Sequence, residues 1–126
     1  MNPCQMLIVE DDADIREQLQ IIIEDEGYTV HVCANGLEAL EYLKSMNVDA
    51  YPRCILMDLM MPKMNGEELY QALQKDQGLK TIPVILATAR GEREKAPDSF
   101  PPGIERINKP MDIDDLIKVL ERHCKD

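Results

Sequence analysis

The sequence predicts an α/β fold, a doubly wound parallel sheet of five strands with helices on both faces. Short apolar runs alternate with longer amphipathic segments along the 126 residues, so that strands and helices follow one another in turn. The apolar runs are almost continuous, which is typical of strands covered on both faces. Right-handed crossovers between strands leave few topologies for such a chain.

Five segments have the composition of strands. The first ends abruptly at three consecutive acidic residues. The second is rich in β-branched residues, which favour extended backbone, and the fifth is the weakest of the set. The expected strands are residues 7–9, 28–33, 54–57, 83–88 and 104–108.

Apolar residues recur at helical spacing in the segments between and after these strands. Gly27 ends the first helix, and Asn35 with Glu38 resembles a capping box at the start of the second. A third helix is expected over residues 67–76, and a last one over 112–124. The last helix carries a regular apolar stripe. Its positions are Ile113, Leu116, Ile117, Leu120 and Cys124.

The composition argues against several classes of partner. The 14 basic residues are outnumbered by 24 acidic ones, for a formal charge of −10. This charge argues against nucleic acid or an anionic membrane as the main partner, because both select for basic surfaces. No apolar run is long enough to span a bilayer. No targeting segment is recognised at the start, so we expect a soluble, cytoplasmic protein.

The four cysteines are widely spaced, at Cys4, Cys33, Cys54 and Cys124. They form no C-x-x-C pair, so a zinc site is not expected. In the reducing compartment that a cytoplasmic location implies, free thiols are favoured over disulfides.

Polar and charged residues collect where the expected strands end. The first strand runs into Glu10 and Asp11, the third ends at Asp58, the fourth at Thr88 and the fifth just before Lys109. In a parallel sheet these ends share one edge, where ligands bind. Three carboxylates so close together repel one another, and Mg²⁺, a hard cation that prefers oxygen ligands, relieves the repulsion. A carboxylate nucleophile, Mg²⁺, an ammonium and a hydroxyl are the groups that stabilise a transferring phosphoryl group.

Each of these residues also has an ordinary structural interpretation. Glu10, Asp11 and Asp12 can cap the following helix and complement its dipole, and for Asp12 this interpretation is preferred. Asp58 alone can be a turn residue, and Lys109 an ordinary loop lysine. Their coincidence at one edge of one sheet is what favours a functional site.

Four motifs in sequence order resemble the receiver domain of two-component response regulators. Each motif alone is weak, but the four together are specific and extend over nearly the whole chain. The motifs are LIVEDD at residues 7–12, ILMDLMMPKMNG at 55–66, VILATA at 84–89 and NKP at 108–110. The resemblance implies a (βα)5 fold with strand order 2-1-3-4-5. It also implies that residues 1–126 form a single receiver domain, and we expect no output domain.

The resemblance implies a phospho-acceptor. Asp58 corresponds to the aspartate that a histidine kinase or a histidine phosphotransfer protein phosphorylates in this family, and its carboxylate is also a metal ligand. The protein is therefore expected to be a signalling switch that changes its binding to a downstream protein.

The other site residues are implied in the same way. Glu10 and Asp11 correspond to the acidic pair that binds Mg²⁺ in the family, and Met60 would give the metal its backbone carbonyl. Thr88 and Lys109 correspond to the hydroxyl and the lysine that contact the phosphoryl group.

Two features depart from the family pattern. Arg106 stands where an aromatic residue is usual, and its charge needs a partner if it is buried, which puts the usual aromatic switch in doubt. Residues 91–103, where the fourth helix belongs, contain Pro97, Pro101 and Pro102. Proline inside a helix costs about 3 kcal/mol, so we expect a short or disrupted helix, with Phe100 holding the segment to the core.

Three other functions are compatible with parts of the pattern. They are a phosphotransfer intermediate, a degenerate receiver that serves as a scaffold, and an aspartyl-phosphate phosphohydrolase. The scaffold is disfavoured because the candidate site residues are all present. The phosphohydrolase is disfavoured because it needs a general acid two residues after Asp58, where Met60 stands. We therefore do not expect an enzyme.

Overall fold

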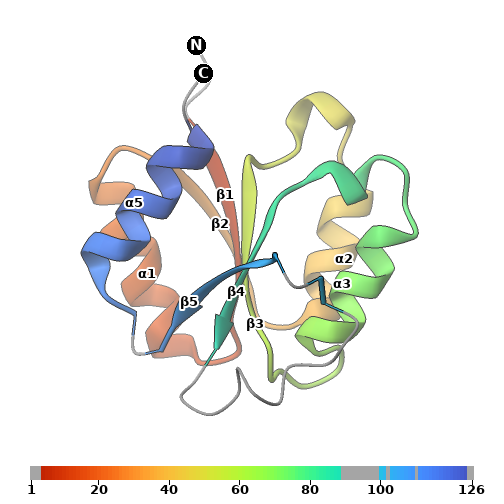
Figure 1. Ribbon diagram of the computed structural model, residues 1–126, viewed down its shortest axis with the longest axis horizontal. Helices are drawn as coiled ribbons and strands as arrows, with labels where there is room; N and C mark the ends of the chain where they lie inside the picture. The colour runs from red at the N-terminus through yellow and green to blue at the C-terminus, as the bar shows by residue number, and fades with distance from the viewer. Residues whose placement is uncertain (1–3, 89–99, 102, 110, 125–126) are drawn as a thin grey trace.

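The computed structural model describes residues 4–88, 100–101, 103–109 and 111–124 (Figure 1). Five parallel strands form one sheet in the order β2-β1-β3-β4-β5, which confirms the predicted fold and strand order. The strands are β1 (Gln5–Val9), β2 (Thr29–Cys33), β3 (Cys54–Asp58), β4 (Val84–Thr88) and β5 (Glu105–Asn108). The α-helices are α1 (Ala13–Asp25), α2 (Gly36–Lys44), α3 (Gly66–Gln74) and α5 (Ile113–Cys124), and 3-10 turns cover Val48–Ala50 and Leu79–Thr81.

The strands direct alternate side chains into two separate cores. In β1, Leu7 and Val9 belong to the core beneath α2 and α3, whereas Met6 and Ile8 belong to the core beneath α1 and α5. Figure 1 shows these two helix pairs on opposite faces of the sheet. Because both faces are buried, the central strands are apolar up to their last residues, which accounts for the continuous apolar runs.

Side-chain caps determine where the helices begin. Asp12 caps α1 by accepting the N–H groups of residues 14 and 15, as predicted. Asn35 caps α2 by accepting the N–H of Glu38. The two reciprocal bonds of a complete capping box occur at α3 instead, between Asn65 and Glu68. Each of these three helices therefore starts at a fixed residue just beyond the edge where the preceding strand ends.

The apolar stripe of α5 is only partly as predicted. Leu116 and Leu120 are buried in the core with Val119, which the predicted stripe leaves out. Ile113 is 49% exposed, because the first turn of the helix extends past the end of the sheet core. Phe100 is buried and its ring packs against Tyr70 with centroids 5.1 Å apart, as expected.

Two further sequence predictions concern the fourth helix and the lack of a membrane-spanning segment. The disrupted fourth helix was expected over residues 91–103, and most of that segment lies outside the described residues. Within the described part of the chain, none of the helices has both the length and the apolar character needed to cross a membrane.

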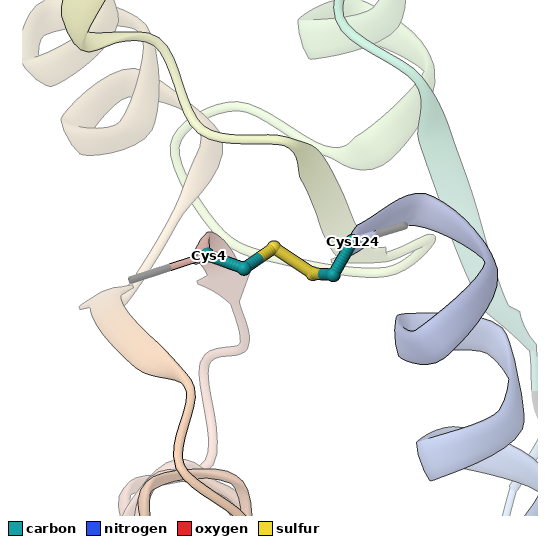
Figure 2. The surroundings of a disulfide bond; sticks show 2 residues. All are labelled: Cys4 and Cys124. Carbon is teal, nitrogen blue, oxygen red and sulfur yellow. A yellow bond between two sulfur atoms is a disulfide. The ribbon is translucent and has the colours of Figure 1, made fainter. Parts of the chain in front are cut away.

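The prediction that all four thiols are free is wrong for one pair. Cys4, just before β1, and Cys124, in the last turn of α5, form a disulfide with their Cα atoms 5.7 Å apart (Figure 2). The residues are separated by 120 positions in the sequence, and only the packing of α5 against the sheet brings them together. Cys33 and Cys54 are free and buried, as predicted.

Two glycines allow the loop between β3 and α3 to approach its neighbours closely. The N–H of Gly36 donates to the carbonyl of Met64 at 2.9 Å, and a Cβ on Gly36 would lie 2.5 Å from that same oxygen. A Cβ on Gly66 would lie 2.6 Å from the carbonyl oxygen of Asp58. Side chains at these positions would therefore displace the loop that follows Asp58.

Reduction of the disulfide is expected to lower the free energy of unfolding by roughly 2–5 kcal/mol, because the bond closes nearly the whole chain into one loop and restricts the unfolded state. Urea unfolding with and without a reductant measures this effect. The variant Cys124→Ser should match the reduced protein and show no response to the reductant. Equal stability of the oxidised and reduced protein would contradict the prediction.

The substitution Gly36→Ala is expected to lower the free energy of unfolding by about 1–3 kcal/mol, the usual effect of overpacking. Gly103→Ala is the matched control, because a Cβ there meets nothing within 4 Å. Its stability should be unchanged or slightly raised. Thermal unfolding of the two variants compares them directly, and equal values would show that the loop moves without cost.

Candidate functional site

The site lies at the edge of the sheet where the strands end. Because the strands are parallel, the residues after β1, β3, β4 and β5 converge there. Two of the acidic residues, Glu10 and Asp58, are among the few buried polar residues of the described chain, and Thr88 is another. A buried polar group needs a partner, so the contacts that these three residues make at this edge decide whether their burial is stable.

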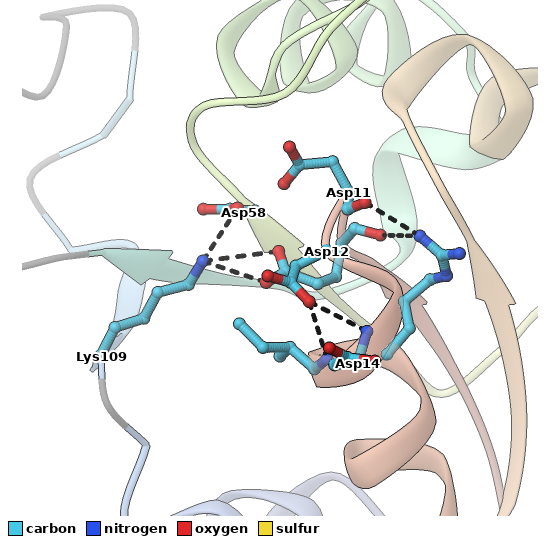
Figure 3. Close-up of polar contacts among 8 residues, drawn as sticks. Asp11, Asp12, Asp14, Asp58 and Lys109 are labelled. Atoms are coloured by element: carbon cyan, nitrogen blue, oxygen red, sulfur yellow. Dashed lines mark hydrogen bonds and ion pairs between the residues drawn. The ribbon is translucent and has the colours of Figure 1, made fainter.

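Three carboxylates form a cluster at this edge. Glu10, Asp11 and Asp58 each offer an oxygen, and these oxygens all lie within 4.8 Å of one another. Glu10 and Asp58 are buried, whereas Asp11 is exposed at the mouth of the site. Figure 3 shows Asp11 and Asp58 above Lys109 and the start of α1. Oxygen ligands in this arrangement suit Mg²⁺.

Lys109 provides the positive charge of the cluster. Its Nζ lies 2.8 Å from Oδ2 of Asp58 and 3.4 Å from both carboxylate oxygens of Glu10. Burial by itself lowers the pKa of Lys109, but the hydrogen bond and charge of Asp58, together with Glu10, outweigh it, so the net shift is upward. The ammonium therefore stays charged and holds the two buried carboxylates together.

The pKa of Glu10 is raised strongly in the metal-free protein. Burial, then a hydrogen bond to Asp58 and the charge of Asp58, raise the pKa of Glu10 from 4.5 to about 8. The charge of Lys109 opposes this shift but does not cancel it. The single positive charge of Lys109 is therefore too small to balance the carboxylates of the cluster. This imbalance favours the binding of a cation.

Thr88, at the end of β4, is fully buried and its Oγ1 has no hydrogen-bond partner among the described residues. Its backbone carbonyl accepts the N–H of Lys109 at 2.8 Å, which ties the ends of β4 and β5 together. A buried hydroxyl without a partner is rare in folded proteins. Among the described residues, the Thr88 hydroxyl is thus left able to donate a hydrogen bond.

Met60 lies in the loop after β3, and its side chain is 62% exposed. The loop is closed by a hydrogen bond from the N–H of Gly66 to the carbonyl of Leu59 at 2.9 Å. Met60 is thus held directly next to the acidic cluster in the chain, while its thioether points to solvent and cannot donate or orient a proton.

Arg106, the departure from the family pattern, lies on β5. Its side chain lines a groove of about 630 Å³ between β5 and α5, together with Asp112 and Asp115. Its Nε is buried without a hydrogen-bond partner among the described residues. Lys118 and Arg122 line the same groove, so Arg106 lies in a groove of mixed charge, where an aromatic ring would have packed against apolar groups.

Arg16 is a site residue that the sequence prediction left out. Its Nη1 donates to the carbonyl oxygens of Glu10, at 2.9 Å, and Asp11, at 3.1 Å. A signal was present in the sequence, because Arg16 is the only lysine or arginine in the first 43 residues. Its place on α1, one turn after the acidic residues, directs it back toward them.

The free energy of unfolding of the metal-free protein is expected to fall as pH rises from about 4.5 to about 8. Over that range the unfolded chain releases the proton of Glu10 while the folded protein, with its pKa near 8, keeps it. Urea unfolding in the presence of a chelator measures the slope. Glu10→Gln should flatten it and Glu24→Gln, an exposed control on α1, should not. An unchanged slope in Glu10→Gln would assign the dependence to another group.

The chain matches known proteins over nearly its whole length. The family model of the response regulator receiver domain matches residues 6–121. The response regulator Rre1 of Synechocystis is 33% identical over 116 residues, which cover 90% of this chain and 48% of that protein. A CpxR homolog of Haemophilus influenzae, a transcriptional regulatory protein, is 40% identical over 88 residues, covering 70% of this chain and 35% of its own length.

Solved structures of receiver domains have the same fold as this chain. The receiver domain of a histidine kinase from Syntrophus aciditrophicus superposes with a TM-score of 0.80 at 31% identity, covering 94% of this chain and 88% of that one. The chemotaxis response regulator CheY4 of Vibrio cholerae has a TM-score of 0.82 at 27% identity, covering 97% and 99% of the two chains. The chain therefore belongs to the response regulator receiver domain family, the phospho-accepting signalling switches of two-component systems.

Proposed function

We propose that Asp58 is the phospho-acceptor of this receiver, and that its phosphorylation changes the binding of a downstream protein. The observation that carries the proposal is the environment of Asp58. Its carboxylate is buried at the end of a central strand, 2.8 Å from Lys109 Nζ and within 4.8 Å of Glu10 and Asp11. Glu10 shares these neighbours, but Asp58 lies closer to Lys109 Nζ, at 2.8 Å against 3.4 Å, and is the residue that ends the central strand β3.

Response regulators receive their phosphate from histidine kinases. The donor we propose is accordingly a phosphohistidine of a histidine kinase or of a histidine phosphotransfer protein. An oxygen of Asp58 forms the new bond to phosphorus and the phosphorus–nitrogen bond of the donor breaks. The donor histidine keeps the electron pair of that bond and takes up a proton.

Receiver domains bind Mg²⁺ at an acidic pocket. Here the ligands we propose are Asp11, Asp58 and the backbone carbonyl of Met60, with Glu10 reaching the ion through a water molecule. The bound ion would neutralise charge on the phosphoryl oxygens. The all-oxygen donor set and the raised pKa of Glu10 support this fit, because both indicate a cluster short of positive charge.

Lys109 and Thr88 complete the proposed site from the neighbouring strands. Lys109 would exchange its ion pair with Asp58 for one with a phosphoryl oxygen, as a charge-assisted hydrogen bond. Thr88 would donate its hydroxyl to another phosphoryl oxygen, which would give its unpartnered Oγ1 an acceptor. Both residues would thereby respond to phosphorylation of Asp58.

Receiver domains are signalling switches and in general not enzymes. We extend this to the present chain and propose that residues 1–126 form one receiver domain without catalytic turnover. The chain spans about half the length of the first relatives it matches.

We also propose a cytoplasmic location and a protein partner, and the formal charge of −10 supports neither nucleic acid nor membrane binding.

The alternative functions have less support. A degenerate scaffold has no need of a buried Lys109–Asp58 pair or an unpartnered hydroxyl. A phosphohydrolase needs an acid at position 60, where an exposed methionine stands. A phosphotransfer intermediate would use the same Asp58 and differs only in what happens to the phosphoryl group afterwards.

Treatment with acetyl phosphate and Mg²⁺ is expected to add one phosphoryl group at Asp58, because this carboxylate lies beside both the metal ligands and Lys109. Intact-protein and peptide mass spectrometry locate the added mass. Asp58→Asn should abolish labelling, as should removal of Mg²⁺ with a chelator. Asp49→Asn, an exposed aspartate outside the site, is the matched control and should label fully. Undiminished labelling of Asp58→Asn would refute the assignment.

A further inference from the structure

Arg16 connects helix α1 to the backbone of the acidic loop. It is the fourth residue of α1, and its side chain extends back beyond the helix start. One nitrogen, Nη1, donates to the carbonyl oxygen of Glu10 at 2.9 Å and to that of Asp11 at 3.1 Å. The guanidinium thus binds the main chain of the two residues whose side chains line the cluster.

We propose that Arg16 is a positioning residue for Mg²⁺ binding, acting through the backbone of Glu10 and Asp11. The inference rests on the proposed function of the cluster as the Mg²⁺ site. Arg16 does not contact the ion in this scheme. It holds the two carbonyl groups on one side of the loop, so that the carboxylates of the same residues remain on the side of Asp58.

The surrounding hydrogen bonds show why one side chain can control this loop. On one side of it, the N–H of Glu10 is fixed by the carbonyl of Cys33 at 3.0 Å. On the other side, Asp12 is fixed as the cap of α1. The two peptide carbonyls between these points are the groups that Arg16 holds. Arg16 is therefore the side chain that restrains these two carbonyl groups among the described hydrogen bonds.

The chemistry of arginine suits this role. Hydrogen bonds from a charged guanidinium to a carbonyl are stronger than those between neutral groups. Arg16 remains charged at every relevant pH, so the loop is held whether or not Glu10 is protonated. The side chain is also partly buried, which reduces competition from water.

Charge and position predict opposite effects of losing Arg16, and this makes the proposal testable. A positive charge near a cation site repels the cation, so its removal alone would tighten Mg²⁺ binding. Loss of a positioning residue disorders the ligands, so its removal would weaken Mg²⁺ binding. The sign of the change in affinity therefore separates the two roles.

The experiment is a titration of the metal-free protein with MgCl₂ at fixed pH and ionic strength. The backbone amide signals in the NMR spectrum report the binding. Arg16→Gln is expected to raise the apparent Kd for Mg²⁺ by about tenfold, as loss of a residue that orients metal ligands does. Arg16→Lys, which keeps the charge without the planar fork, should fall between that variant and the original protein. Lys44→Gln removes an exposed charge at the far end of α2 and should leave the Kd unchanged.

A purely structural effect is excluded by a second control. The protein with its Cys4–Cys124 disulfide reduced is less stable but keeps the loop, so its Kd for Mg²⁺ should not change. Urea unfolding confirms that each variant is folded. If Arg16→Gln does not fold, the comparison of Arg16→Lys with the original protein carries the test, again with weaker binding expected.

Two results would overturn the inference. Unchanged or tighter Mg²⁺ binding by Arg16→Gln, with binding lost in Asp11→Ala, would refute the positioning role and leave the proposed function intact. Absence of Mg²⁺ binding by the original protein would refute the proposed function, and the inference with it. Weaker binding by Arg16→Gln, with Lys44→Gln unchanged, would support both.

Discussion

The rest of this structure depends on two buried carboxylates, those of Glu10 and Asp58, that are held by a single ammonium. Glu10 and Asp58 lie side by side out of contact with water, and Lys109 bridges them. The single positive charge of Lys109 does not balance the two carboxylates, and burial together with the charge of Asp58 raises the pKa of Glu10. A bound cation would relieve this imbalance.

The strand order decides how these groups meet. Glu10 and Asp58 follow β1 and β3, which are neighbours, so their carboxylates converge without any long side chain. Lys109 follows β5, and β4 lies between β5 and β3. A lysine is long enough to pass over the end of β4, where Thr88 lies. The backbone N–H of Lys109 donates to the carbonyl of Thr88, so the ends of β4 and β5 are joined there.

Residues outside the acidic cluster hold in place the loops that carry it. Glycines at 36 and 66 let the loop after β3 pack closely, and Arg16 holds the backbone after β1. Arg106 departs from the family pattern on β5, where it lines a groove of mixed charge between β5 and α5.

Local patterns in the sequence determined the strands, the four described helices and the residues at the strand ends. Apolar periodicity and caps such as Asp12 act between near neighbours, so they are visible without a structure. The Cys4–Cys124 disulfide, the contact of Arg16 with the acidic loop and the raised pKa of Glu10 were decided only by the tertiary structure. Each depends on distance, direction or burial between groups that packing brings together, and the spacing of residues along the chain records none of these.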